Sequence, residues 1–297
     1  MERELWRRIV WALKRLPRWS PRNAVYNNRE VLAVLLWAAL HDRSILWACR
    51  RFNWPVQAWR RRLPDQSTMS RRLRDPQLIE DLTVMMAKLQ RGAPCDVLIV
   101  DGKPLPVSEY SGDPEARDGW GAGRHALGYK LHVLIDAAQR LLAWEIRPMN
   151  EAECVVAADL LRQAARHGTL PAQALMLGDA SYDSNRLHQT AETFQIRLIA
   201  PRRKAKRSIS ASHRQHPGRL LSIQLMERDA ISANRCRAAR TAVERYLGTL
   251  ASVGGGLHAL PAWARRLMRV RLWVGAKLAI HAARYRHHHS REHADAA

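Results

Sequence analysis

The pattern of apolar and polar positions changes near residue 95 and divides the chain into a helical part and a part with strands. Residues 1–90 show helical spacing, and Arg29–Arg50 keeps this spacing without a glycine or a proline. Ser67 has the position of an N-cap for a short helix that ends at Asp75-Pro76. We therefore predict an all-helical domain over residues 1–90.

Short apolar or alternating segments after residue 95 predict a sheet. Val97–Val100 and Ala174–Leu177 are apolar throughout, as expected for strands buried on both faces. The predicted strands are Val97–Val100, Tyr129–Asp136, Arg140–Ile146, Ala174–Leu177 and Ile196–Ala200, and helices are predicted over residues 151–167, 184–193, 234–250 and 262–285. This order indicates an α/β fold, a mixed five-stranded sheet flanked by helices, in residues 91–285. Residues 113–128 are predicted to form a mobile loop, and residues 286–297 a disordered tail.

The charge of the chain is high and unevenly distributed. The sequence has 49 Lys and Arg against 27 Asp and Glu, a formal net charge of +22, for which an acidic polymer is the expected partner. The net charge is +10 in residues 1–90, −3 in residues 91–200 and +15 in residues 201–297. This distribution suits an enzyme that needs carboxylates for metal and cations for phosphate. The alternative, on charge alone, is a chance cluster of solvated acids.

The sequence argues against a membrane protein. Its longest apolar run, Val31–Leu40, is ten residues long, whereas a spanning helix needs roughly 20 apolar residues. The four cysteines are scattered without metal-ligand spacing, as expected in a reducing cytoplasm. We therefore expect a cytoplasmic protein without a membrane partner.

Two aspartates follow apolar strands and are candidates for metal ligands. Asp101 follows Val97–Val100, and Asp179 comes two residues after Leu177. If the two strands are neighbours in a parallel arrangement, their carboxyl ends bring the side chains together at one sheet edge. Mg²⁺ prefers carboxylate oxygens, water and substrate phosphate, and two such ions about 4 Å apart support phosphodiester displacement. The alternative for each Asp is an ordinary turn, since Asp101 precedes a glycine.

Glu244 is a third candidate because it is an isolated acid in a basic helix. It is the only acidic residue between Asp229 and Glu292, and the same helix carries Arg237, Arg240 and Arg245. Arg240 and Glu244 are four residues apart and share a helical face, so a surface ion pair is the ordinary alternative.

Several segments, taken together, resemble the DDE-type transposases of bacterial insertion sequences, in the broad group of insertion-sequence families four and five. No single segment is specific, but their order and spacing are. The segments are Ile99-Val100-Asp101-Gly102, Gly128-Tyr129-Lys130-Leu131-His132 with Asp136, Leu177-Gly178-Asp179-Ala180-Ser181-Tyr182-Asp183, Arg240-Thr241-Ala242-Val243-Glu244-Arg245, and, in the N-terminal region, His41-Asp42-Arg43-Ser44 and Leu63-Pro64-Asp65-Gln66-Ser67-Thr68 with Arg71-Arg72-Leu73.

The resemblance implies an RNase H-like fold in which Asp101, Asp179 and Glu244 are the catalytic, metal-binding triad. It implies two Mg²⁺ ions, for which Mn²⁺ would substitute. The family's signature around the glutamate is Tyr-x2-Arg-x3-Glu-x6-Lys, and Arg240 and Glu244 match it. This chain departs from the signature at Arg237 and Ala251, which stand at the Tyr and Lys positions.

The helical domain of residues 1–90 is the predicted DNA-binding domain, and residues 91–285 are the predicted catalytic domain. The residues expected to contact DNA are basic side chains outside the triad. Lys130 and His132 share one face of a strand, with a structural histidine whose hydrogen bonds are satisfied as the alternative for His132. The basic run 202–207 has no apolar face to bury, so it is assigned to phosphate contacts, with a disordered solubilising segment as the alternative. The predicted DNA-binding residues are Lys130, His132, Arg202, Arg203, Lys204, Lys206, Arg207, Arg237, Arg240, Arg245, Arg71 and Arg72.

The sequence thus predicts a DNA transposase that cleaves strands at the ends of an insertion sequence and transfers them to target DNA. The expected partner is double-stranded DNA, bound by a homodimer, in the bacterial cytoplasm and associated with the nucleoid. Two alternatives stay open: an RNase H-like DNA nuclease without strand transfer, and a catalytically inactive, element-derived protein that only binds DNA.

Overall fold

The chain forms two compact units in a computed structural model that describes residues 2–56, 58, 61–90, 92, 94–121, 123–203, 214–252 and 255–292, with side chains up to residue 284. One unit, the helical unit, comprises Met1–Arg91 and Thr249–Ala297. The other, the sheet unit, comprises Gly92–Gly248. The sequence prediction placed residues 249–285 with the sheet. In the structure they belong to the helical unit, because the buried face of the last helix packs on the N-terminal helices.

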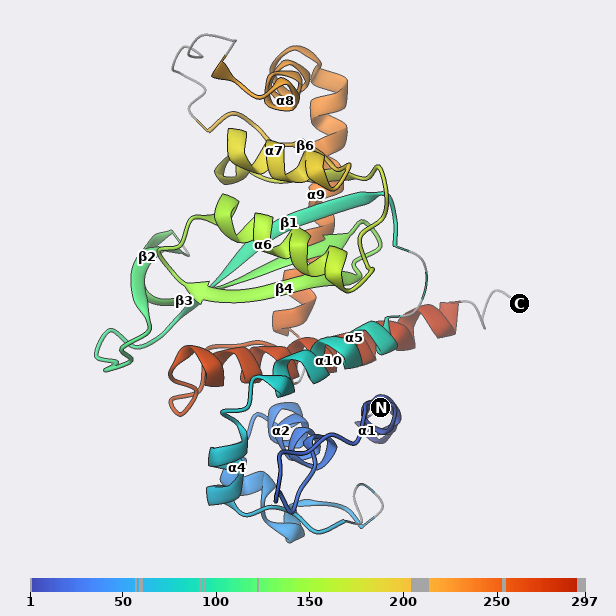
Figure 1. Cartoon of the computed structure of the whole chain (residues 1–297), viewed down its shortest axis with the longest axis vertical. Helices are drawn as coiled ribbons and strands as arrows, with labels where there is room; N and C mark the ends of the chain where they lie inside the picture. Colours follow the sequence, from blue (N-terminus) through green and yellow to red (C-terminus); the bar gives the residue numbers. More distant parts are fainter. Residues whose placement is uncertain are drawn as a thin grey trace. The chain divides into compact units, whose positions relative to one another are not determined.

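The helical unit is built around two apolar helices that are distant in sequence. Helix α2 is buried almost all round, and the long helix α10 packs against α1, α2 and α5 (Figure 1). Lys277 on α10 is buried and donates a hydrogen bond to Ala39 O at 2.6 Å. The helices of this unit are α1 (Glu2–Lys14), α2 (Asn28–Leu40), α3 (Ile45–Ala48), the 3-10 helix η1 (Arg51–Asn53), α4 (Gln66–Arg72), α5 (Gln77–Leu89) and α10 (Leu267–Glu292).

Three predicted features of this unit differ in the structure. The helix predicted over 29–50 ends at Leu40, because Asp42 takes a left-handed conformation, with φ of 52°, and Ser44 caps a new helix. The N-cap of α4 is Asp65 instead of Ser67, since its carboxylate accepts from Thr68 N at 2.6 Å. Residues 286–292, assigned to a disordered tail, continue α10, and residues 293–297 lie outside the described residues.

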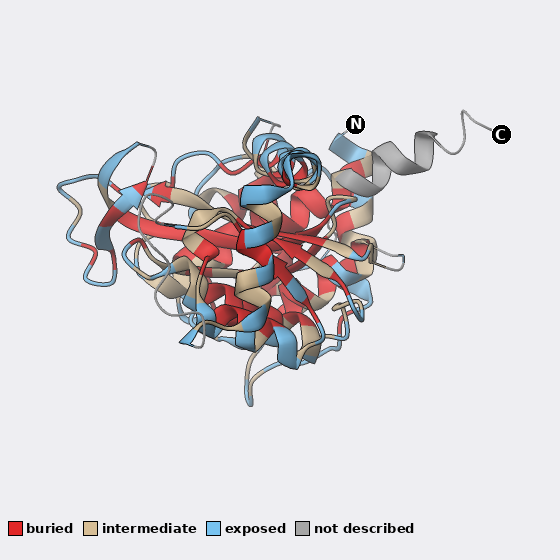
Figure 2. Cartoon of the chain, turned by 90° about the horizontal axis from the view of Figure 1, so that it is seen from above, coloured by how far each residue is buried: buried red, intermediate tan, exposed pale blue. Residues whose placement is uncertain are grey.

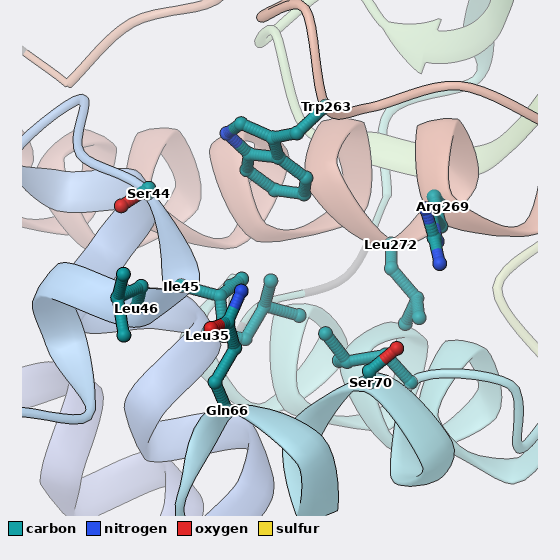
Figure 3. Close-up of a pocket in the computed structure, with 10 residues that line it drawn as sticks. Leu35, Ser44, Ile45, Leu46, Gln66, Ser70, Trp263, Arg269 and Leu272 are labelled. Atoms are coloured by element: carbon teal, nitrogen blue, oxygen red, sulfur yellow. The ribbon is translucent and has the colours of Figure 1, made fainter.

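A small pocket lies inside the helical unit. Its volume is about 190 Å³, and its walls are mainly apolar side chains, including Leu35, Leu73, Trp263 and Leu272 (Figure 3). The described residues that line it include none of the predicted site residues.

Among the described residues, no helix is long and apolar enough to span a membrane.

The second unit contains a mixed sheet, which has six strands where five were predicted. Its order is β2-β3-β1-β5-β6, with β4 also paired to β3. The strands are β1 (Val97–Pro106), β2 (Arg117–Gly121), β3 (Arg124–Asp136), β4 (Leu141–Pro148), β5 (Leu175–Leu177) and β6 (Arg197–Ile199). β1 is antiparallel to β3 and parallel to β5, and β6 is parallel to β5.

The additional strand, β2, lies within the segment that was predicted to be a mobile loop. It pairs with the first part of β3, from Arg117↔Gly128 to Gly121↔Arg124. A Cβ on Gly119 would lie 2.5 Å from Met149 O, so glycine allows this ribbon to approach the chain that follows β4. Gly119, one of the glycines that interrupt the hydrophobic period, therefore serves close packing.

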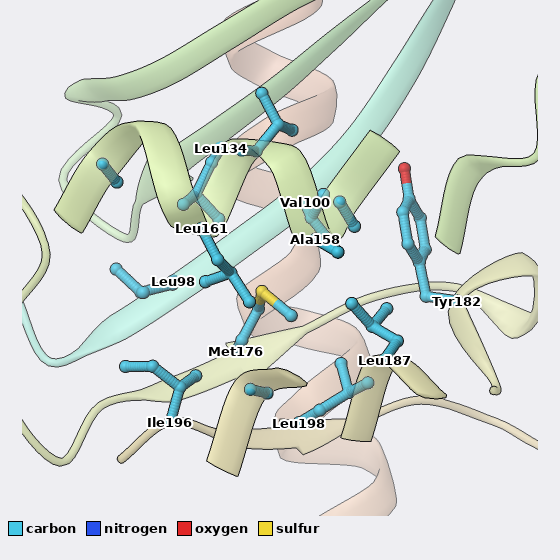
Figure 4. Packing of buried hydrophobic residues seen from close by; sticks show 14 of the residues in the cluster. Leu98, Val100, Leu134, Ala158, Leu161, Met176, Tyr182, Leu187, Ile196 and Leu198 are labelled. Carbon is cyan, nitrogen blue, oxygen red and sulfur yellow. The ribbon is translucent and has the colours of Figure 1, made fainter. Parts of the chain in front are cut away.

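Helices cover both faces of the sheet. On one face, α6 (Glu153–Arg166) and α7 (Asn185–Thr193) bury a core that includes Val100, Leu134 and Tyr182 (Figure 4). α8 (Pro217–Arg228), which was not predicted, packs on β6, and α9 (Ala230–Ser252) passes behind the sheet (Figures 1 and 4). The strands between these layers are largely buried, and the outward faces of the helices are exposed (Figure 2).

Candidate active site

Asp101 lies where the parallel neighbour of its strand ends. β1 does not stop at Asp101, as the sequence suggested, but runs on to Pro106 against β3. Its pairing with β5, in contrast, ends at Ile99↔Leu177. Asp101 therefore extends beyond the last residue of β5, into the space at the carboxyl end of that strand.

The carboxylate of Asp101 is desolvated and lies among other charges. Burial raises its pKa to about 6, an effect that Asp179 and Glu153 increase, while the N–H of Gly102 and the guanidinium of Arg240 act in the opposite direction. Oδ1 accepts from Gly102 N at 2.8 Å, and Oδ2 lies 4.0 Å from Arg240 Nη2. One oxygen of Asp101 is thus held by the backbone, and the other faces the guanidinium of Arg240.

Asp179 belongs to a tight turn that directly follows β5. Its Oδ1 accepts from Ser181 N at 2.8 Å and from Ser181 Oγ at 2.5 Å, which caps the 3-10 helix η2 (Ala180–Tyr182). A Cβ on Gly178 would lie 2.8 Å from the ring of Tyr182, so glycine lets the turn fold back over this buried tyrosine. Among the described residues, no group donates to Asp179 Oδ2.

A third acid, Glu153, stands beside the two aspartates and was missed in the sequence analysis. It opens α6, and its charge contributes to the raised pKa of Asp101. Its Oε1 accepts from Lys130 Nζ at 2.7 Å, and its Oε2 accepts from Ser181 Oγ. The sequence signal was weak, since an acid in the first turn of a helix is common for electrostatic reasons alone.

Glu244, the third predicted ligand, is exposed on α9. Arg240, one turn earlier on the same helix, reaches Asp101, and among the described residues its ion pair is with Asp101 and not with Glu244. Among the described side chains, no three His, Cys, Asp or Glu stand close enough to hold one metal ion. The structure therefore brings Asp101 and Asp179 together and leaves Glu244 outside their immediate group.

The two aspartates fit a divalent cation. In the described part of the chain, each has one oxygen that is engaged by a backbone N–H and a second oxygen without such a donor. Hard carboxylate oxygens are what Mg²⁺ prefers, and this ion usually takes only one or two carboxylates, with water and phosphate completing its shell. A cation would also offset the repulsion that the charge of Asp179 exerts on the desolvated Asp101.

Two predicted DNA contacts lie inside the sheet unit. Lys130 is 9% exposed and pairs with Glu153, and His132 is 1% exposed. Burial lowers the pKa of His132 to about 3, with Lys130 and Arg147 acting in the same direction. In this structure neither side chain offers a surface to a DNA phosphate, and the two ring nitrogens of His132 have no hydrogen-bond partner among the described residues.

The remaining predicted DNA contacts differ in their exposure. Arg71, Arg203, Arg237 and Arg245 are exposed. Arg72 donates to Tyr26 O and to Asn28 Oδ1, and Arg202 forms an ion pair with Glu227 at 2.7 Å, so both have structural partners. Lys204, Lys206 and Arg207 lie outside the described residues.

Comparisons with known proteins identify the family of the chain. Residues 93–276 match the family described as Transposase DDE domain, which covers more than half of the chain. In solved structures, the chain is similar to the piggyBac transposase in a synaptic complex with hairpin DNA, with a TM-score of 0.51, 12% identity, and coverage of 97% of this chain and 72% of that chain.

A further match is to a simian T-cell lymphotropic virus intasome with the PP2A regulatory subunit B56 gamma, with a TM-score of 0.24, 14% identity and 70% coverage of each chain. That score is too low to carry an argument. No curated protein matches. The similarity to the piggyBac transposase supports the α/β fold with an N-terminal helical region. The family match extends across the sheet and both aspartates, and the chain therefore belongs to the transposases with a DDE domain.

Proposed function

We propose that the chain catalyses metal-dependent strand cleavage and strand transfer at the ends of an insertion sequence. The observation that supports this most is the convergence of Asp101 and Asp179 at the end of β5, where a backbone N–H engages only one oxygen of each carboxylate among the described residues. Divalent ions bound there, two Mg²⁺ or Mn²⁺, would activate the attacking oxygen and stabilise the leaving one.

The residues of the chain then have distinct roles. Asp101 and Asp179 bind the cations, and the backbone N–H groups of Gly102 and Ser181 fix the orientation of the two carboxylates. We assign Glu244 as the third acid, because it is the only acid on α9 and lies one turn from Arg240, which already reaches Asp101. Arg240 compensates the negative charge of the site and is available to a phosphate.

The exposed arginines of the sheet unit are the proposed DNA contacts. Arg203 follows β6, and Arg237 and Arg245 project from α9, the helix that carries Arg240. The bound DNA is double-stranded. Pairing two transposon ends requires two copies of the chain, so we propose a homodimer on DNA.

Strand transfer is tested with a transposon end that has already been cut. With Mg²⁺ and a target plasmid, we expect joined products, because the same carboxylates serve cleavage and joining. The measurement is the yield of branched or integrated DNA on a gel. Cleavage of uncut ends without any joining of cut ones would instead favour the nuclease alternative. Binding without either reaction would favour the inactive, DNA-binding alternative.

Replacing Arg237 and Arg245 together with glutamine is expected to weaken DNA binding to all sequences alike. The logarithm of the association constant falls with the logarithm of the salt concentration, and each lost phosphate contact should reduce the magnitude of this slope by about 1. The double variant should therefore reduce it by about 2. Fluorescence anisotropy at several salt concentrations measures this slope. Arg162→Gln, which removes an exposed arginine from α6, is the control. An unchanged slope in the double variant would remove α9 from the DNA interface.

A further inference from the structure

Glu153 uses both of its carboxylate oxygens within the site. Lys130 on β3 donates to Oε1 at 2.7 Å, and both side chains are mostly buried, with 11% of Lys130 and 18% of Glu153 exposed. The pair fills the space beside Gly102, where a Cβ would lie 3.0 Å from Lys130 Cδ and 3.4 Å from Glu153 Oε1. The glycine after Asp101 thus makes room for this ion pair.

Ser181 connects Glu153 to Asp179. Its hydroxyl lies between Glu153 Oε2 and Asp179 Oδ1, but a hydroxyl has only one proton to donate. The backbone N–H of Ser181 already binds Asp179 Oδ1 at 2.8 Å. When the hydroxyl of Ser181 donates its proton to Glu153, Asp179 therefore still accepts a hydrogen bond from the backbone N–H of Ser181. The hydrogen bond to Glu153 fixes the rotamer of the Ser181 side chain.

We propose that Glu153 is a positioning residue for Asp179 that acts through Ser181, while Lys130 neutralises its charge. The chain of contacts ties the turn after β5 to the start of α6 and to β3, so Asp179 Oδ1 is held and Oδ2 is directed to a cation. Both oxygens of Glu153 accept from side chains of the protein, whereas no described group donates to Asp179 Oδ2. This inference rests on the proposed metal-dependent function.

The test measures Mn²⁺ affinity of the full chain by electron paramagnetic resonance, with MnCl₂ as the only ligand. Partners of metal ligands typically contribute roughly 10- to 100-fold to affinity, so Glu153→Ala and Ser181→Ala should each weaken binding by that factor. Because Glu153 and Ser181 act through one contact, the double variant should bind Mn²⁺ no more weakly than the single variant with the lower affinity. Glu151→Ala, two residues before Glu153 and paired only loosely with Arg147 at 3.9 Å, should bind as wild type.

A neutral pair separates positioning from direct ligation. Lys130→Met with Glu153→Gln removes both charges and leaves a carbonyl that accepts from Ser181, so most of the affinity should return. If this pair binds as weakly as Glu153→Ala, or if Glu153→Ala changes only thermal stability, positioning by Glu153 is wrong. If wild type binds no Mn²⁺, or if Asp179→Ala binds it unchanged, the proposed function fails together with this inference.

Discussion

Replacing Asp101 or Asp179 with alanine is expected to abolish metal-dependent strand cleavage while DNA binding persists. Each variant removes one of the two carboxylates that converge at the end of β5. Phosphodiester displacement depends on positioned charge, and the loss of one such group costs on the order of 1,000-fold or more, or about 4 kcal/mol in activation free energy. The measurement is the cleavage rate of a labelled transposon end in Mg²⁺.

The fold should tolerate Asp101→Ala, whereas Asp179→Ala also removes the cap of η2. The carboxylate of Asp101 is desolvated and faces other acids, so its charge does not stabilise the folded chain. The measurement is thermal unfolding of both variants. The control is Asp159→Ala, which removes an acid from α6 in the same unit. Cleavage near the wild-type rate in either variant would remove that aspartate from the site.

The sequence predicted where the two aspartates lie relative to the strands because that signal is local. An acid that directly follows an apolar strand lies at the carboxyl end of that strand. Val97–Ile99 and Leu175–Leu177 pair as parallel neighbours, so the two aspartates lie at the same edge of the sheet. The strand length was not predictable in the same way. β1 continues through Gly102 and Pro104 because β3 supplies a long partner, and a pattern within one strand does not show its partner.

Contacts between distant segments account for the rest of the differences. Glu153 resembled any acid at a helix start, and only the fold brings Lys130 and Ser181 to it. The same contact engages Nζ of Lys130 inside the protein, although the charge of this residue had suggested a contact with DNA. Helix α10 was predicted as a helix, but its partners α2 and α5 lie at the other end of the chain.

Replacing Glu244 with alanine decides whether α9 supplies the third acid. If Glu244 completes the metal site, as we propose, cleavage should fall by about 1,000-fold, as for the two aspartates, and Glu244→Gln should fall equally because it removes the charge. If Glu244 is only an exposed acid in a basic helix, its loss should change the free energy of unfolding by less than about 0.5 kcal/mol and leave cleavage unchanged.

The position of Arg240 makes the first outcome the expected one. Its guanidinium stands 4.0 Å from Asp101 Oδ2, so this turn of α9 already approaches the carboxylates, and the acid one turn later is exposed instead of being paired with it. Glu192→Ala, which removes an exposed acid from α7 in the same unit, controls for charge. Full cleavage by Glu244→Ala would leave two aspartates as the only acids of the proposed triad and would require the third ligand to come from elsewhere.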